Sequence, residues 1–204
     1  MPPASTSTSG PLKRDRSLIE QISHRVDKPL AIVEYDAAWQ DQFTLVRQRI
    51  QQALGHRALT IEHVGSTSVP GLPAKAVIDL DLVVADPAQE TEYVPALEAA
   101  GFQFVFREPS WYDHRFLGLD EPFPANVHVF APGCPELRRH LVFRDWLRSC
   151  EEDRLDYARV KREAAQITCQ EGGSFVDYND RKAFVSWRIL GRASKAHNAG
   201  LLDS

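Results

Sequence analysis

Two aspartates interrupt the most strand-like run of the sequence, AVIDLDLVVA. Its many β-branched residues favour an extended conformation. The two-residue period of a strand places Ile78, Leu80 and Leu82 on one face, with Asp79 and Asp81 on the other. Because like charges repel and each carboxylate loses hydration among apolar neighbours, the acidic pair needs compensation from its surroundings.

Two kinds of compensation are compatible with this pattern. The pair can end its strand facing solvent or arginines, or it can bind a divalent cation, since carboxylate oxygens on one rigid strand suit Mg²⁺. Gly65-Ser66, which follows the strand-like run LTIEHV, favours the cation. A Gly-Ser turn leaving a strand can present backbone N–H groups and a hydroxyl to phosphate oxygens.

The remaining pattern predicts one domain of the α/β (α+β) class. Residues 1–28 open with Pro, Ser and Thr and are expected to form a flexible tail, while 29–204 form the single domain. Strands are expected at LAIVEY, LTIEHV, AVIDLDLVVA, FQFVF, HRFLGL and NVHVF. Helices are expected from an N-cap at Asp36 to Gly55, from about Ala88 to Gly101, and from Pro135 to about Ala193 with breaks near Cys150 and Gly172-Gly173. This order predicts a mixed β-sheet flanked by helices, with a helical C-terminal section.

Composition excludes several classes of protein. With 43% hydrophobic and 25% charged residues the chain is globular, and it contains no apolar run long enough for a membrane span and no signal-peptide pattern. We therefore expect a cytoplasmic protein. The net charge of -4 argues against duplex nucleic-acid binding, and three scattered cysteines indicate neither a disulfide framework nor a metal knuckle.

The spacing of the motifs resembles a known superfamily. An apolar residue, Gly65-Ser66, twelve further residues and then Asp79-Leu80-Asp81 resemble the signature of DNA polymerase β-like nucleotidyltransferases. The runs EYDAAW, IEHVGSTSVPGLPAKAVIDLDLVV, NVHVF and HLVFRDWLR resemble the successive motifs of the GrpB family, from about Leu30 to Ala193. GrpB-like domains also occur fused to dephospho-CoA kinase.

The resemblance implies roles for individual residues. It places Gly65 and Ser66 at the phosphates of a nucleoside triphosphate, and Asp79 and Asp81 at Mg²⁺ or Mn²⁺. Nucleotidyltransferases normally carry a third acid on a later strand, and here His128 stands in that position. Imidazole can ligate a metal or act as a base, but it brings no negative charge to hold a second Mg²⁺.

Further candidates near these motifs each have a structural alternative. Lys75 precedes the acidic strand and could meet a phosphate or the carboxylates, or could be a solvated loop residue. His63 should share the face of Gly65, although strand histidines are often packing residues. Arg107 and Arg115 could bind phosphate or balance the charge of the acidic pair.

Two tyrosine–lysine pairs are spaced four residues apart on expected helices, so each pair should share a helix face. They are Tyr157 with Lys161 and Tyr178 with Lys182. A nucleobase could stack on a tyrosine while a lysine meets phosphate. The alternative is an amphipathic helix with half-buried tyrosines and solvated lysines.

Three functions are compatible with these residues. The first is a metal-dependent nucleotidyltransferase that uses Asp79, Asp81 and His128 to join a nucleotidyl group from a nucleoside triphosphate to a hydroxyl acceptor. The second is a binding or assembly module that keeps the fold without turnover. The third is a metal-dependent phosphate-ester hydrolase built from the same three residues and His63.

Overall fold

A computed structural model of the protein describes residues 15–26 and 29–200. The strands are β1 Glu20–Gln21, β2 Thr60–Val64, β3 Ile78–Val83, β4 Gln103–Glu108, β5 His114–Leu119 and β6 Ala125–Phe130. The α-helices are α1 Ala38–Leu54, α2 Val94–Ala99, α3 Pro135–Ser149, α4 Glu151–Gln170 and α5 Phe175–Asn198. Short 3-10 helices occupy Arg16–Leu18, Gly55–Arg57, Ser66–Ser68 and Glu90–Glu92.

The six strands form one mixed sheet in the order β1-β4-β5-β6-β3-β2. β3 and β6 run parallel at its centre, and every other neighbouring pair is antiparallel. The parallel register aligns Asp79 with Asn126 and Asp81 with His128. The sheet therefore brings the acidic pair and the predicted third-slot residue together, although 47 residues separate Asp81 from His128 in the sequence.

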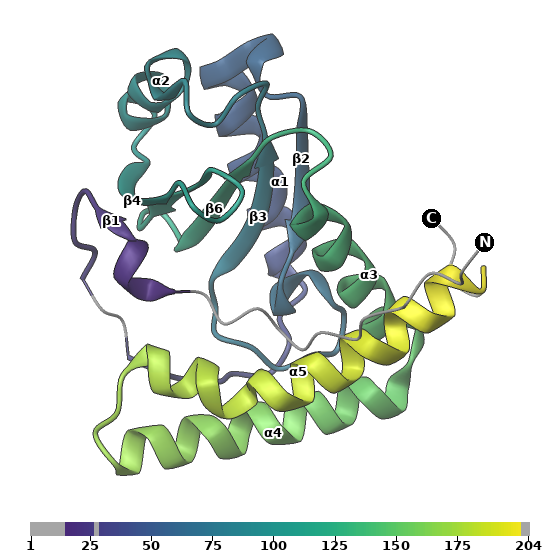
Figure 1. Ribbon diagram of the computed structural model, residues 1–204. Helices are drawn as coiled ribbons and strands as arrows, with labels where there is room; N and C mark the ends of the chain where they lie inside the picture. Colours follow the sequence, from purple (N-terminus) through teal and green to yellow (C-terminus); the bar gives the residue numbers. More distant parts are fainter. Residues whose placement is uncertain (1–14, 27–28, 201–204) are drawn as a thin grey trace.

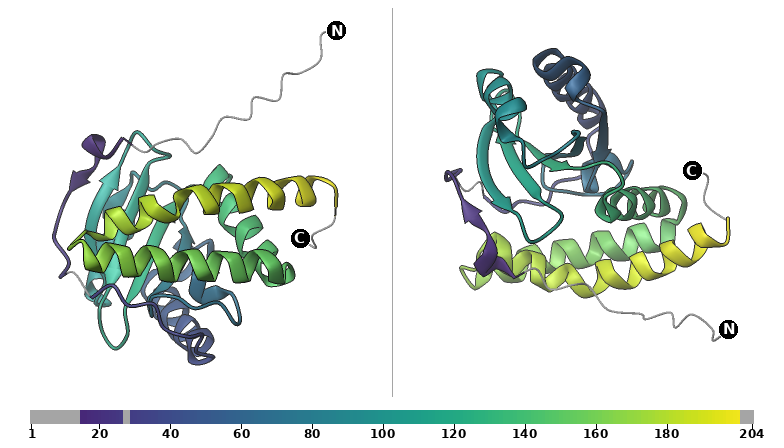
Figure 2. Two further views of the ribbon diagram at one scale, coloured as in Figure 1. Left: turned by 90° about the horizontal axis from the view of Figure 1, so that it is seen from below. Right: turned by 45° about the horizontal axis from the view of Figure 1, so that its top comes forward.

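Helices cover both faces of the sheet, as expected (Figure 2). α1 and α2 lie on one side, while α3 and the long antiparallel pair α4 and α5 lie on the other (Figures 1 and 2). The main core forms under α1 and α2, where Ile78, Leu80 and Leu82 are fully buried. Their alternation leaves Asp79 and Asp81 on the opposite face, toward α3, α4 and α5.

Two elements differ from the expected pattern. LAIVEY is not a strand, because Val33 makes only an isolated bridge to Ala74, while Leu30 and Ile32 pack against the α4–α5 pair. The helix expected from Ala88 starts only at Val94. Pro95 explains this, because its missing N–H and fixed φ suit a first helical turn and not a helix interior.

The other helices follow the expected boundaries. α1 ends at Leu54, and Gly55, with a φ of 57°, is its C-cap. Its N-cap is Ala37 and not the expected Asp36, which lies one residue further out and accepts a hydrogen bond from Ala38 N at 2.9 Å. The C-terminal helices break at Cys150 and before Ser174, and α5 extends five residues past Ala193 to Asn198.

Part of the expected N-terminal tail belongs to the sheet. Residues 1–14 lie outside the described residues, but Glu20 and Gln21 pair with β4. Ile22 N also donates to Val105 O at 2.9 Å. These are main-chain bonds, which explains why an analysis of apolar side chains missed the segment. None of the helices in the described part of the chain combines the length and apolar character needed to cross a membrane.

Candidate functional site

Asp79 is held by a side-chain relay that starts in the N-terminal segment. Asn126 Nδ2 donates to Asp79 Oδ1 at 2.7 Å, and Asn126 Oδ1 accepts from the Arg25 guanidinium at 2.8 Å. Arg25 also donates to Asp120 Oδ1 at 2.8 Å and to Leu119 O. An arginine only donates and an ionised carboxylate only accepts, so Asn126 is oriented by both neighbours.

Gly65 packs directly against the other side of the Asp79 carboxyl. Its φ of 68° is in the left-handed region, and a Cβ added there would lie 2.5 Å from Asp79 Oδ2. Glycine is therefore required both by the turn and by the close approach. Burial raises the pKa of Asp79, while the bond from Asn126 and the charges of Lys182 and Lys75 oppose that rise.

Beside Asp79 lies a pocket of about 70 Å³, which we call the lysine pocket. Its lining comes from the Ser66 turn, residues 74–77 before β3, β3 itself, β6, α4 and α5. It consists of Ser66, Thr67, Ala74, Lys75, Val77, Asp79, Asn126, Lys161, Phe175, Tyr178 and Lys182. Five of the predicted site residues therefore meet in one place. Three lysines and a serine hydroxyl around a small pocket favour an anionic ligand with several oxygens.

Three members of the two helical tyrosine–lysine pairs line this pocket, namely Lys161, Tyr178 and Lys182. Lys161 Nζ lies 5.1 Å from the centroid of the Tyr157 ring, and Lys182 Nζ lies 4.9 Å from that of Tyr178. Lys161 is 1% exposed and Lys182 is partly buried, so the alternative of solvated lysines is wrong. Lys75 Nζ lies 3.9 Å from the ring centroid of Phe175, which holds the lysine at the pocket and not in a free loop.

Asp81 is paired with a residue that the sequence analysis did not single out. His140 of α3 places Nδ1 at 2.9 and 3.1 Å from the two oxygens of Asp81. Asp81 is 1% exposed, and burial raises its pKa against the opposing hydrogen bond from His140. Both of its oxygens are therefore engaged within the protein.

His128 ends a chain of hydrogen bonds that starts at Glu108. Glu108 Oε2 lies 2.6 Å from His114 Nδ1, and His114 Nε2 lies 3.1 Å from His128 Nδ1. Glu108 and His114 are buried. A carboxylate behind a histidine fixes the ring orientation and favours proton acceptance at its far end, which is the arrangement of a general base and its orienting groups. The His128 ring centroid also lies 6.2 Å from that of His140.

The side chains alone do not complete a cation site. Among the described residues, no group of three or more His, Cys, Asp or Glu side chains is arranged to hold a metal ion. Mg²⁺ commonly takes only one or two carboxylates and completes its coordination with water and substrate phosphates. Asp79 and Asp81 share one face of β3, so a cation held there would have to take its remaining ligands from water or from a substrate.

His63 lies on the other face of the sheet. It pairs in register with Leu80, stacks on Phe43 at 4.6 Å between ring centroids, and has Nε2 3.0 Å from Thr67 Oγ1. Burial is the main cause that lowers its pKa to about 3, so it stays neutral. His63 is therefore a packing residue, which removes the predicted substrate contact and one member of the hydrolase set.

Arg107 and Arg115 are also remote from the acidic pair. Both bind Glu90, with Arg107 Nη2 and Arg115 Nε each 2.6 Å from its carboxylate oxygens. Arg115 pairs in register with Val129, whose side chain belongs to the core under α1 and α2. The expected role in balancing Asp79 and Asp81 is wrong, because the carboxylate that these arginines balance is Glu90, whereas phosphate binding by either arginine stays a prediction.

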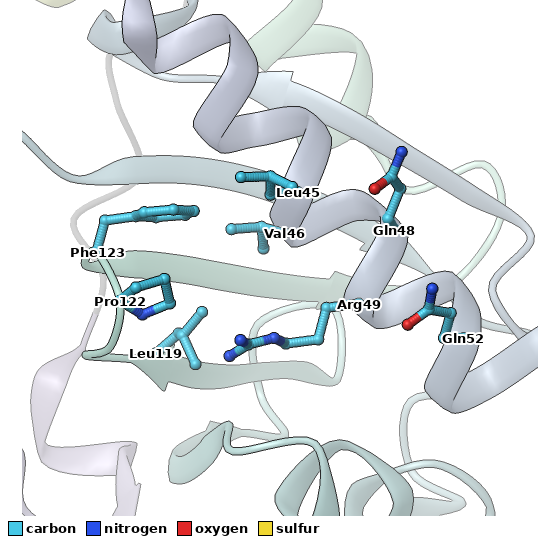
Figure 3. Close-up of a pocket in the computed structure, with 8 residues that line it drawn as sticks. All are labelled: Leu45, Val46, Gln48, Arg49, Gln52, Leu119, Pro122 and Phe123. Atoms are coloured by element: carbon cyan, nitrogen blue, oxygen red, sulfur yellow. The ribbon is translucent and has the colours of Figure 1, made fainter.

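A larger hollow of about 290 Å³ lies between α1 and the β5–β6 connection (Figure 3). Its lining is Leu45, Val46, Gln48, Arg49, Gln52, Leu119, Pro122 and Phe123. Arg49 extends toward Leu119 (Figure 3). Its Nη1 donates a hydrogen bond to Glu121 O at 3.2 Å. The lining contains no acid, histidine or nucleophile, so this hollow offers no side chain for acid–base or nucleophilic chemistry.

The residues missed by sequence analysis divide into two kinds. Asn126 lies two residues before His128, so the strand period alone places it on the same face. Arg25, Glu108, His114 and His140 reach the site through long-range packing, and no spacing in the sequence signals that.

Comparison with known proteins establishes the family. The GrpB protein family matches residues 29–192, so the chain belongs to the GrpB family. A UPF0157 protein of Halalkalibacterium halodurans is 44% identical over 199 residues, covering 95% of this chain and 99% of the relative. A UPF0157 protein of Streptomyces coelicolor is 37% identical, covering 94% of this chain and 98% of the relative.

Two further matches concern structure and domain context. The crystal structure of conserved protein GrpB from Enterococcus faecalis matches with a TM-score of 0.69 at 29% identity, covering 82% of this chain and 99% of that one. A dephospho-CoA kinase of Mycolicibacterium paratuberculosis is 34% identical over 163 residues, which cover 68% of this chain but 40% of the kinase.

Proposed function

We propose that the chain is a nucleotidyltransferase in which the lysine pocket receives phosphates of a nucleoside triphosphate. The observation that supports this most strongly is the convergence of Ser66, Lys75, Lys161 and Lys182 beside Asp79. The lysines would neutralise the phosphates, and fixed positive groups around a reacting phosphate lower the barrier to its transfer.

The reaction would join a nucleotidyl group to an acceptor hydroxyl. The hydroxyl oxygen attacks the α-phosphorus, the bond from that phosphorus to the bridging oxygen breaks, and pyrophosphate leaves with the electron pair. His128 would accept the hydroxyl proton, because the Glu108–His114 chain orients its ring. Along β6 it lies two residues, roughly 7 Å, beyond Asn126, so an acceptor can lie between it and the pocket.

Mg²⁺ or Mn²⁺ would be held by Asp79 and Asp81 together with phosphate oxygens. Such an ion neutralises charge on the transferring phosphates. Asp79 is oriented for this by Asn126 and by the close packing of Gly65. Asp81 would have to share its oxygens between the ion and His140.

A second candidate function follows from that requirement. Since both oxygens of Asp81 already engage His140 and no third acid is present in the slot of His128, the same pocket could bind a phosphorylated ligand without turnover. The match to part of a dephospho-CoA kinase is compatible with such a binding or assembly module.

Thermal unfolding with a panel of nucleoside triphosphates, with and without Mg²⁺, tests whether the chain binds a nucleotide, as both proposed functions require. A ligand that binds only the folded chain raises the midpoint of unfolding. We expect a Mg²⁺-dependent increase for the wild type that Asp79→Asn abolishes. Pyrophosphate release in the presence of an acceptor would identify the transferase, whereas nucleotide binding without release would identify the binding module. An unfolding midpoint that no nucleotide changes would contradict both functions.

A further inference from the structure

Lys161 of α4 differs from the other lysines of the pocket. Its side chain is 1% exposed, and its Nζ has no hydrogen-bond partner among the described residues. A buried ammonium without a partner is costly, and buried polar groups are normally satisfied. The chain therefore keeps an unsatisfied amine at a position where it lines a pocket.

The charges around Lys161 favour its uncharged form. Burial is the largest cause that lowers its pKa well below the usual value, and the positive charges of Lys182 and Arg162 act in the same direction. Asp79 opposes them. Burial raises the pKa of Tyr178, on the facing helix, to about 12, so this tyrosine is uncharged near neutral pH.

Lys182, on the facing helix, behaves in the opposite way. Burial lowers its pKa, but Tyr157, Tyr178 and Asp79 outweigh this effect and raise it. The pocket thus contains Lys182, whose pKa is raised, and Lys161, whose pKa is lowered. Lys75, stacked on Phe175, supplies a further positive charge.

The size of the pocket limits what can enter it. Its volume is about 70 Å³, whereas pockets that enclose whole drug-sized ligands are roughly 300–1,000 Å³. A nucleoside does not fit, but a phosphate group of five heavy atoms is of the right order. The remaining part of a ligand must lie outside, over the face of the sheet that carries Asp81 and His128.

We infer that the lysine pocket encloses a single terminal phosphate group and that Lys161 takes up a proton when this group binds. This assignment rests on the proposed function and specifies that the terminal phosphate is the part of the triphosphate that the pocket encloses. A phosphate dianion provides the opposite charge that the protonated amine lacks, and the ammonium then donates charge-assisted hydrogen bonds to it. The proton comes from water or buffer, and no covalent bond changes.

Two properties of binding follow from this arrangement. Ligands with a dianionic phosphate end bind with proton uptake. Sulfate, a dianion of similar size, should bind with the same proton uptake although it cannot take part in nucleotide chemistry. The base lies outside the pocket, so ATP and GTP bind with similar affinity.

Calorimetric titration of the full chain tests the inference. Sulfate, inorganic pyrophosphate, ATP and GTP are titrated in the presence of Mg²⁺ at a pH of about 8.5, where phosphate ends with a second pKa near 6 are already dianionic. Repeating each titration in buffers of different ionisation enthalpy gives the number of protons bound. Lys161→Met and Lys161→Gln remove the amine, and Lys195→Met, at an exposed position of α5, is the matched control.

We expect the wild type and Lys195→Met to take up as much as about one proton per ligand, in proportion to the uncharged fraction of Lys161. Both Lys161 variants should bind at least roughly tenfold more weakly and without uptake. The ¹⁵N resonance of Lys161 Nζ in the wild type should move from the amine to the ammonium range when pyrophosphate is added.

Several results would overturn the inference while leaving the proposed function intact. These are ATP binding with no proton uptake, equal uptake in the Lys161 variants, or affinities for ATP and GTP that differ more than roughly tenfold. Conversely, proton-coupled binding of pyrophosphate and sulfate without binding of any nucleotide would support the inference and contradict the proposed function. Absence of binding by all four ligands would overturn both.

Discussion

Asn126 Nδ2 donates a hydrogen bond of 2.7 Å to Asp79 Oδ1, across the parallel pair of strands at the centre of the sheet. The orientation of this amide is set from the other side by Arg25. The carboxylate at the centre of the proposed site is thus connected to the N-terminal segment that adds β1 to the edge of the sheet.

Loss of Arg25 should therefore weaken ligand binding from a distance. In Arg25→Gln the fixed orientation of Asn126 is lost. We expect affinity for triphosphate or pyrophosphate to fall by roughly three- to tenfold, which corresponds to the net free energy of about one ordinary hydrogen bond. Affinity is measured by calorimetry. Arg16→Gln, in the same segment but paired with exposed Asp180, is the control and should bind like the wild type.

Gly118→Ala tests the same relay without changing any of its members. A Cβ at Gly118 would collide with the Arg25 side chain, which is flexible and can move away. We expect affinity to fall as in Arg25→Gln while the unfolding midpoint changes little. Wild-type affinity in both variants would show that Asn126 needs no partner beyond Asp79.

A pair of glycine substitutions separates backbone strain from contact with Asp79. Gly65 and Gly71 have φ of 68° and 76°, so alanine costs roughly 1–2 kcal/mol of conformational strain at each. At Gly71 the new Cβ meets nothing within 4 Å, whereas at Gly65 it meets the Asp79 carboxyl. We expect Gly65→Ala to unfold at lower denaturant concentration than Gly71→Ala and to lose ligand binding, which Gly71→Ala keeps. Equal stability and equal binding would mean that Asp79 moves freely.

Lys161→Met should stabilise the chain near neutral pH. The pKa of Lys161 is lowered in the folded state, so the unfolded state binds more protons, and wild-type stability rises with pH until the unfolded lysine also loses its proton near about 10.4. Lys161→Met lacks this pH-dependent contribution to stability, and removal of the unsatisfied amine stabilises the folded state by about 1–3 kcal/mol. Denaturant unfolding from about pH 7 to about pH 10 should show an advantage for the variant that shrinks with pH. An advantage independent of pH would instead indicate better packing, and destabilisation would show that the amine has a partner.

The central strand could be predicted because a single local pattern determines it. The alternation around Asp79 and Asp81 predicted both their common face and the buried face of β3. The resemblance to nucleotidyltransferases placed His128 beside the pair, and the parallel register of β6 aligns it with Asp81. The i, i+4 spacing likewise placed Lys161 and Lys182 beside their tyrosines. The faces of β3 and the pairing of each lysine with its tyrosine depend only on local backbone geometry.

Where contacts depend on packing between distant segments, the predictions were incomplete. No local signal shows that His140 of α3 reaches Asp81 or that Arg25 reaches Asn126. For His63 the error has a simple cause. The strand ends at Val64 and Gly65 turns with a positive φ, so the strand period could not be continued through Gly65 to the pocket.

Transfer of labelled phosphorus tests the proposed reaction most directly. The chain is incubated with Mg²⁺, a small-molecule extract as the source of acceptors, and nucleoside triphosphates labelled at the α or the γ phosphorus, with Asp79→Asn as the control. Nucleotidyl transfer predicts that only the α label enters a new product, together with release of labelled pyrophosphate from the γ-labelled substrate, and that Asp79→Asn forms neither. Movement of the γ label into the product, or no product at all from a chain that binds the nucleotide, would contradict it.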